Sequence, residues 1–181
     1  MKTMYLFLAE GFEEIEALAP VDVMRRAGLR VVMVSTTDSL EVKGAHGIPV
    51  VADALFSQLD YADAALLFLP AGLPGATNLE AHEALGKLLV QKASEEVVVS
   101  AICAAPLVLG GLGLLEGKSA TCYPGFEDTM KGAHYTAAKV TVDGNIFTAC
   151  GPAAAWELGF TFVEHFCGTE KADELRRGMQ F

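Results

Sequence analysis

The stretch that decides the fold is Val97-Val98-Val99-Ser100-Ala101-Ile102-Cys103-Ala104-Ala105-Pro106-Leu107-Val108-Leu109. Its first half is apolar at nearly every position and shows no period of two, as in a strand that a parallel sheet covers on both faces. Its second half predicts a helix, because Pro106 suits the first helical turn, where a missing N–H costs little. We therefore predict a buried strand that runs directly into a helix, with Cys103 at the junction.

Outside this stretch, strand-like and helix-like patterns alternate. Three further apolar runs lack a period of two: residues 4–9, 31–35 and 64–69. Three segments show helical spacing: residues 15–24, 78–91 and 156–167. This order predicts βαβ units, and hence an α/β fold with a mostly parallel sheet and helices on both faces. The length of 181 residues fits a single domain over residues 1–181.

A hairpin interrupts this order near the end of the chain. Asp143-Gly144 lies between residues 139–142 and 145–149, and this dipeptide suits a type I′ turn. The sequence therefore predicts a small β-hairpin beside the parallel strands.

The charge of the chain excludes several classes of partner. There are 23 acidic and 13 basic residues, a net charge of −10, so the surface repels nucleic acid and anionic membranes. No apolar stretch reaches the roughly 18 residues that suggest a membrane span. We expect no membrane association and no direct nucleic-acid binding.

The cysteines and histidines form neither a disulfide framework nor a metal site. The four cysteines include no C-x-x-C pair, and no secretory signal pattern precedes them. The four histidines show no ligand spacing, and the glycines of residues 70–76 match neither a dinucleotide nor a P-loop motif. We expect a cytoplasmic protein with reduced thiols, no metal and no organic cofactor.

Cys103 is the candidate reactive residue. Its small neighbours permit a sharp turn, as in nucleophile elbows, and open α/β sheets place their sites at the carboxyl ends of parallel strands. A helix N-terminus favours a thiolate, so we expect the pKa of Cys103 to fall below about 8.5. The alternative is that Cys103 only packs the junction, which is our interpretation of Cys122, Cys150 and Cys167.

Glu16 is the candidate partner of this cysteine. It clusters with Glu13 and Glu14 at the start of a predicted helix, where capping explains the first two. Glu16 lies among apolar residues, so we expect it to face partly inward and Pro20 to kink or restart the helix after it. Such a glutamate has a raised pKa. In its protonated form it can hydrogen-bond a thiolate and act as a general acid.

Several motifs together resemble the DJ-1/ThiJ/PfpI superfamily, on its DJ-1 side. They occur in the right order over nearly the whole chain: Gly11-Phe12-Glu13-Glu14-Ile15-Glu16, Pro20-Val21-Asp22-Val23-Met24-Arg25-Arg26-Ala27-Gly28, Leu69-Pro70-Ala71-Gly72, Ala101-Ile102-Cys103-Ala104, His134-Tyr135-Thr136 and Gly151-Pro152. The resemblance implies a flavodoxin-like three-layer sandwich and a homodimer. It also implies that Cys103 is the nucleophile, that Glu16 is the buried acid bonded to it, and that the backbone N–H groups of Gly72 and Ala104 bind an oxyanion.

Two residues depart from patterns in the family. Protease-like members have a histidine directly after the cysteine, where this chain has Ala104, so peptidase or amidase activity is disfavoured. Many members with glyoxalase III or deglycase activity have a histidine where this chain has Tyr123, which can donate a hydrogen bond but is a poor base near neutral pH. His46 is a further possible accessory residue, with a surface histidine as the alternative.

Two functions are open at this point. The first is a cofactor-free enzyme that acts on small α-oxoaldehydes such as methylglyoxal, or on their early glycation adducts. In it, Cys103 is the nucleophile and Glu16 the acid and base. The second is an oxidative-stress sensor or redox-regulated chaperone, in which Cys103 is oxidised to sulfinic acid with little turnover.

Overall fold

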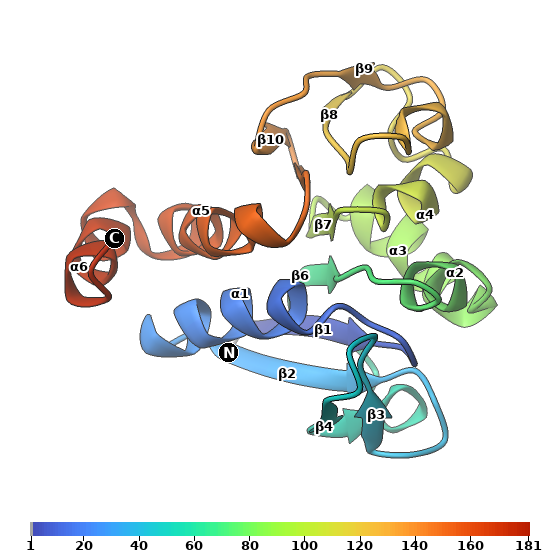
Figure 1. The fold of residues 1–181 in the computed structure, drawn as a ribbon, viewed down its shortest axis with the longest axis horizontal. Coiled ribbons are helices and arrows are strands. Elements are labelled where there is room, and N and C mark those ends of the chain that lie inside the picture. Colours follow the sequence, from blue (N-terminus) through green and yellow to red (C-terminus); the bar gives the residue numbers. More distant parts are fainter. Residues whose placement is uncertain (1) are drawn as a thin grey trace.

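The computed structural model describes residues 2–181, and within that range its main feature is a sheet of seven strands (Figure 1). The strand order is β10-β11-β7-β6-β1-β2-β5. The strands are β1 Thr3–Leu8, β2 Arg30–Ser35, β5 Ala54–Leu55, β6 Ala64–Leu69, β7 Val98–Ile102, β10 Val140–Asp143 and β11 Ile146–Ala149. Every neighbouring pair is parallel except β10 with β11, which is the hairpin. The predicted α/β fold with a mostly parallel sheet is confirmed.

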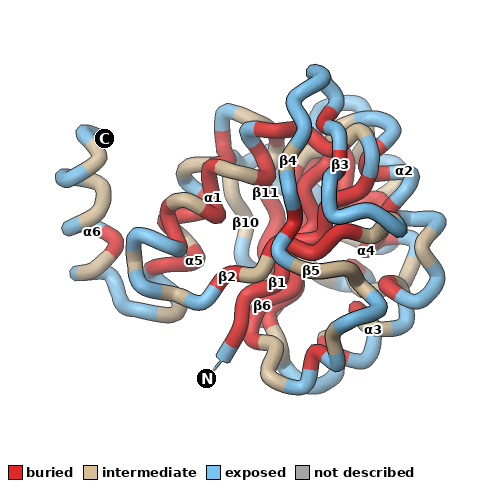
Figure 2. Tube along the Cα trace, turned by 90° about the horizontal axis from the view of Figure 1, so that it is seen from below, coloured by how far each residue is buried: buried red, intermediate tan, exposed pale blue. Residues whose placement is uncertain are grey.

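Helices cover both faces of this sheet and complete a three-layer sandwich (Figures 1 and 2). The helices are α1 Glu14–Arg26, α2 Gly75–Glu80, α3 Glu83–Ser94, α4 Pro106–Gly111, α5 Ala155–Cys167 and α6 Thr169–Gly178. One face carries α1 and α5, with α6 packed on α5, and the other face carries α2, α3 and α4. No helix in residues 2–181 combines the length and apolar character that crossing a membrane demands.

Short elements connect these layers. A small antiparallel sheet pairs β3 (Glu41–Lys43) with β4 (Pro49–Val51), and a parallel one pairs β8 (Ser119–Ala120) with β9 (His134–Tyr135). Three short 3-10 turns lie at Phe56–Gln58, Glu127–Thr129 and Pro152–Ala154.

The central strands are buried on both faces, which explains their unbroken apolar sequences. Every residue of β1 and β7 is buried. Side chains alternate between two apolar clusters, one under α1 and α5 and one under α2 to α4. Burying one large apolar side chain stabilises the fold by about 1.5–3 kcal/mol, so each face holds its helices firmly. The sheet therefore offers a rigid edge at the carboxyl ends of β1, β6 and β7.

Two of the expected helix features are wrong. Residues 78–91 do not form one helix, because α2 ends at Glu80 and the ring of His82 accepts a hydrogen bond from the Leu85 N–H (3.0 Å), which starts α3 anew. Helix α1 also continues through Pro20, so the helix does not restart there. Pro20 removes one backbone hydrogen bond, and the burial of its neighbours Ala19 and Val21 in the apolar cluster under α1 and α5 offsets that loss.

The hairpin is present, but its turn differs from the expected one. Asp143 pairs with Ile146, so the turn is centred on Gly144 and Asn145. Gly144 has a φ of 60°, whereas Asn145 does not have a positive φ, and a type I′ turn needs both. The Asn145 amide donates to the carbonyls of Ala93 (2.9 Å) and Val97 (3.0 Å), which fixes the turn against the start of β7.

Candidate active site

Cys103 lies on a sharp turn directly after β7. Its φ is 63°, a left-handed conformation that costs about 1–2 kcal/mol for a residue with a Cβ. Two hydrogen bonds hold it there: the Cys103 N–H donates to the Ala149 carbonyl (2.8 Å), and the Tyr123 N–H donates to the Cys103 carbonyl (2.8 Å). The following residues, Ala104 and Ala105, are small and buried. The backbone therefore turns the thiol out of the strand while leaving it partly exposed.

Glu16 meets this thiol from the first turn of α1. Its side chain has no exposed surface, as expected for an inward-facing residue. Its Oε2 accepts a hydrogen bond from the Ala71 N–H (3.0 Å), whereas Oε1 has no nitrogen or oxygen partner in residues 2–181. The Cys103 thiol lies close enough to this carboxyl group for each to shift the pKa of the other, although no hydrogen bond of ordinary geometry joins them. The structure thus brings together the two residues that the sequence selected from distant segments.

The two groups change each other's proton affinity. Burial raises the pKa of Glu16 to about 7, although the neighbouring Cys103 thiol and the hydrogen bond from the Ala71 N–H oppose the shift. Burial and the Glu16 carboxylate raise the pKa of the Cys103 thiol, and the Ala104 N–H offsets only part of that. The expected fall of the thiol pKa is therefore wrong, because burial and the neighbouring carboxylate outweigh the backbone at the start of α4. Above about pH 7 the pair carries one negative charge and keeps one proton.

The loop after β6 brings a second set of backbone groups to the pair. The Glu13 N–H donates to the Ala71 carbonyl (2.8 Å), which fixes this loop to the start of α1. Gly72 has a φ of 81°, and a Cβ there would lie 2.5 Å from the Glu13 nitrogen and would also collide with the Gly11 carbonyl. Only glycine fits such a close approach.

The N–H groups of Gly72 and Ala104 are both available. Neither N–H donates to an oxygen acceptor in residues 2–181, and the Ala104 backbone lies close enough to the Cys103 sulfur to lower the pKa of the thiol. Backbone donors that are already fixed in place and unused can stabilise a negative oxygen without reorganisation. This geometry is compatible with the oxyanion-binding role that the resemblance implies.

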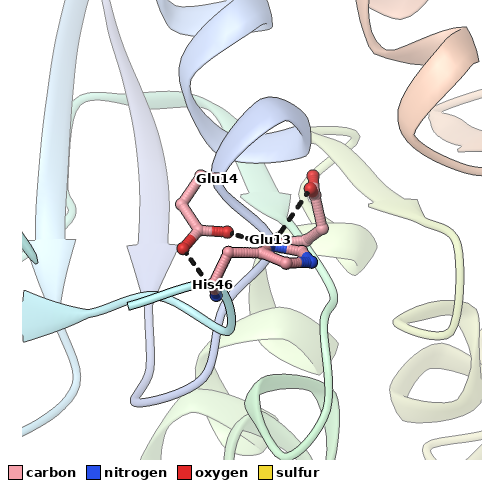
Figure 3. A group of neighbouring side chains, drawn as sticks. All are labelled: Glu13, Glu14 and His46. Carbon is pink, nitrogen blue, oxygen red and sulfur yellow. Dashed lines mark hydrogen bonds and ion pairs between the residues drawn. The ribbon is translucent and has the colours of Figure 1, made fainter. Parts of the chain in front are cut away.

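The two accessory candidates lie at different places. Tyr123 is bonded to Cys103 through its backbone, and its half-exposed ring lies against Gly151. His46 lies on the loop between β3 and β4, and its Nδ1 is 2.7 Å from Glu14 Oε2 and 3.8 Å from Glu13 Oε1 (Figure 3). Tyr123 therefore adjoins the cysteine turn, whereas His46 reaches it only through the glutamates.

Glu13, Glu14 and His46 also have the composition of a metal site. Their candidate ligand atoms all lie within 4.8 Å of one another, the one such group in residues 2–181 (Figure 3). Glu14 accepts hydrogen bonds from the backbone and ring of His46 at 2.8 and 2.7 Å. This ion pair accounts for the grouping as a clamp between α1 and the loop of residues 44–48, and we assign no metal to it.

Glu13 has more roles than sequence reasoning gave it. Its Oε2 accepts a hydrogen bond from the Glu16 N–H (2.7 Å), so it caps α1 and orients the residue that meets the thiol. It also lines a cavity of about 450 Å³ with Glu14, Ile15, His46, Ile48 and Pro152. The spacing of Glu13 and Glu16 was a visible capping signal, but nothing in the sequence indicated the cavity. Glu14, in contrast, holds the loop of residues 44–48 and is not the cap we expected.

Comparison with known proteins gives one consistent answer. The DJ-1/PfpI family model matches residues 2–165. The chain is 33% identical to protein dj-1beta of Drosophila melanogaster, over 98% of this chain and 96% of that protein. It is 40% identical to the DJ-1 homolog A of Arabidopsis thaliana over 96% of this chain, but spans only 45% of that relative's length. A further relative, 30% identical over 95% of this chain and 92% of its own length, is named glutathione-independent glyoxalase DJR-1.2 of Caenorhabditis elegans.

Solved structures agree with the sequence comparisons. The structure of oxidized Toxoplasma gondii DJ-1 superposes with a TM-score of 0.95 at 31% identity, covering 100% of this chain and 99% of that one. The match includes the order of strands and helices that positions Cys103 and Glu16. This chain belongs to the DJ-1/PfpI family.

Proposed function

We propose that this protein is a cysteine-dependent enzyme that converts small α-oxoaldehydes, or their early glycation adducts, into hydroxy acids. Cys103 is the nucleophile and Glu16 carries protons. The observation that carries this proposal is the buried Glu16 carboxyl next to the Cys103 thiol, with a pKa that burial raises to about 7. A general base with a pKa near the working pH is the most effective kind. One relative that bears a glyoxalase name supports the choice of substrate.

The first chemical step forms a carbon–sulfur bond. The Glu16 carboxylate takes the thiol proton as the sulfur attacks the aldehyde carbon of methylglyoxal. The aldehyde oxygen becomes an oxyanion, which the N–H groups of Gly72 and Ala104 stabilise. Protonated Glu16 then returns the proton to that oxygen. The product is a hemithioacetal on Cys103, and Glu16 is again a carboxylate.

The second step moves a hydrogen between the two carbons. Glu16 removes the proton from the carbon that bears sulfur, which gives an enediolate, and returns it to the neighbouring carbon, while the hydroxyl proton passes from the first oxygen to the second. The result is a lactoyl thioester on Cys103, and water releases lactate and the thiol. The sum is one methylglyoxal and one water giving lactate and a proton, so this route needs no metal, redox partner or glutathione. Tyr123 is positioned next to the cysteine turn as a donor and not as a base.

The direct test is lactate formation from methylglyoxal without glutathione. Wild type should turn over, Cys103→Ser should not, and Cys167→Ser, which changes an exposed cysteine, should behave as wild type. Wild-type protein that forms no lactate at any pH between 6 and 9 would reject the activity. Amidase activity on peptides is expected to be absent, because Ala104 supplies no histidine base.

The second candidate function is that of an oxidative-stress sensor or redox-regulated chaperone with little turnover, in which peroxide oxidises Cys103 to sulfinic acid. The favouring observation is the same pair, since protonated Glu16 can donate a hydrogen bond to a sulfinate oxygen. Mild peroxide should then add two oxygens at Cys103 before Cys122, Cys150 or Cys167. Even oxidation of the four thiols would remove this candidate. All four are free, which fits the reducing cytoplasm that we propose as its location.

We also propose that two copies form a homodimer through one exposed apolar face. Ile15 and Ile48 are each about half exposed, and with Leu18 and Trp156 they line a shallow cavity of about 340 Å³. Exposed apolar side chains that lie together favour association. This face adjoins the cavity next to the candidate active site, since Ile15 and Ile48 line both.

A further inference from the structure

Cys103 and Cys150 lie next to each other where two neighbouring strands of the sheet end. Strands β7 and β11 are parallel, and the last residues paired in their register are Ile102 and Ala149. The Cys103 N–H donates to the Ala149 carbonyl (2.8 Å), which continues the ladder of hydrogen bonds by one step. The next paired positions are therefore Cys103 and Cys150, which brings two thiol-bearing residues to the same edge of the sheet.

The geometry of this pair suits a disulfide bond. Neighbouring strands lie about 4.8 Å apart, and disulfides join residues whose Cα atoms are roughly 4.4–6.8 Å apart. Both side chains pack against the apolar cluster under α1 and α5, and both are partly exposed. Cys103, at its turn, also contacts the cluster on the other face. The two thiols can therefore meet without a rearrangement of the strands.

The other two cysteines are poorer partners for Cys103. Cys122 has no exposed surface and packs in the cluster under α2 to α4. Burial raises the pKa of its thiol to about 11, so it stays protonated and is a weak nucleophile. Cys167 is exposed at the last residue of α5, about 18 Å along the helix from Ala155. Cys150 is thus the one cysteine in residues 2–181 that is both accessible and next to Cys103.

We propose that Cys150 is the resolving cysteine of Cys103, so that oxidation at Cys103 ends in a reversible disulfide between the two. A sulfenic acid condenses with a thiol, and disulfides in a reducing compartment are usually transient and redox-sensing. The inference takes its oxidant, a peroxide, from the second candidate function, whereas the pairing of the two thiols is independent of it. While the disulfide is present, Cys103 cannot attack an aldehyde, so the pair also switches off the proposed enzyme until a thiol reductant restores it.

The atoms balance with hydrogen peroxide as the oxidant. The Cys103 sulfur attacks one peroxide oxygen, which forms an S–O bond and breaks the O–O bond, and Glu16 passes the thiol proton to the departing oxygen, which leaves as water. The Cys150 sulfur then attacks the Cys103 sulfur, which forms the S–S bond and breaks the S–O bond, and the hydroxyl leaves with the Cys150 proton as a second water. Two electrons pass from sulfur to oxygen. The sulfinic acid forms only where a second peroxide reaches Cys103 before Cys150 does.

The first test needs no peroxide. One equivalent of dithiodipyridine is added to the folded protein in a Cys167→Ser background, which removes the exposed thiol. The first cysteine to react releases one pyridinethione and keeps the other half of the reagent, and a neighbouring thiol displaces that half as a second pyridinethione. Trypsin cleaves after lysine and arginine, which leaves Cys103, Cys122 and Cys150 on three separate peptides. We expect two pyridinethiones per reagent, and a Cys103 peptide joined to the Cys150 peptide in a chain of monomer size.

Two variants separate the possible partners of Cys103. Cys150→Ser should release one pyridinethione and leave the reagent on Cys103, whereas Cys122→Ser, the matched control, should still form the link. With excess hydrogen peroxide, Cys150→Ser should accumulate at least about three times as much Cys103 sulfinic acid as protein that keeps Cys150, because no thiol competes with the second peroxide.

The outcomes distinguish this proposal from the sensor function. A folded protein without a Cys103–Cys150 link, or with Cys103 joined to Cys122 instead, would overturn the proposal. So would sulfinic acid that forms at Cys103 in the same yield with and without Cys150. A link that forms with dithiodipyridine while peroxide leaves every thiol unchanged would instead remove the sensor function and keep the disulfide pair.

Discussion

The Glu16 carboxyl group in the first turn of α1 lies beside the Cys103 thiol at the end of β7, and it has no exposed surface. The carboxylate opposes ionisation of the thiol, whereas the neutral thiol favours the carboxylate, so their titrations belong to the pair. A resting thiolate is not required for reaction in this arrangement. The thiol becomes nucleophilic when its proton moves to a neighbour whose pKa is close to 7.

Replacing Glu16 by glutamine should make folding stability less sensitive to pH. The pKa of Glu16 in the folded protein, about 7, lies above its ordinary value of 4.5, so the folded state binds more protons between these two values. The free energy of unfolding of wild type should therefore fall as pH rises from about 4.5 through 7, by at most about 3 kcal/mol from this group. Urea unfolding of wild type and Glu16→Gln at pH 4.5 and pH 8 measures the effect. A stability difference between the two proteins that is the same at both pH values would contradict it.

Gly72→Ala should be far more damaging than Gly28→Ala. Both glycines have nearly the same φ, 81° and 84°, but a Cβ at Gly28 meets nothing within 4 Å, whereas one at Gly72 is 2.5 Å from the Glu13 nitrogen. Gly28→Ala should cost only the backbone strain, about 1–2 kcal/mol. Gly72→Ala should cost about 2 kcal/mol more and, by displacing its N–H, lower kcat/KM for methylglyoxal at least about tenfold. Thermal unfolding and lactate assays on both variants check this, and equal effects would argue against the close approach.

Ile48→Asp should separate the proposed dimer. A charge placed in the apolar face that Ile15, Leu18 and Trp156 share cannot be buried without a large cost. Val90→Asp is the control, because Val90 is also an exposed apolar residue but lies on α3. Sedimentation equilibrium should give a dimer for wild type and Val90→Asp and a monomer for Ile48→Asp. A monomeric wild type, or a dimeric Ile48→Asp, would contradict the assignment of this face.

The sequence predicted the layers of this fold more accurately than the positions at which its helices end or are interrupted. The strands β1 and β7 are apolar without a period of two, which predicts burial on both faces of the sheet. Cys103 follows the end of β7, and this position indicated where a site would lie. The division of α2 from α3 depends on the ring of His82 as a cap, which helical spacing does not reveal. Pro20 stays within α1, a helix that packs on α5, and contacts between helices are not written in local sequence.

The candidate site likewise has features that the sequence predicts and features that depend on the folded structure. The inward-facing position of Glu16 follows from its apolar neighbours, but the raised pKa of the Cys103 thiol depends on burial and on a carboxylate brought close by the fold. A rule for helix N-termini therefore predicted the wrong direction. Similarly, the capping role of Glu13 was visible in the spacing, whereas the cavity that it lines depends on the loop that carries His46.

The most direct test of the shared-proton pair is the pH dependence of Cys103 alkylation by a neutral reagent such as iodoacetamide, followed at the Cys103 peptide. In wild type the rate should rise with a midpoint near pH 7, as Glu16 becomes able to accept the thiol proton. In Glu16→Gln that acceptor is gone, so the midpoint should move above about 8.5, the ordinary value for a thiol, because the sulfur remains buried. If both proteins give the same midpoint, Glu16 does not control the proton of Cys103, and the proposed chemistry loses its basis.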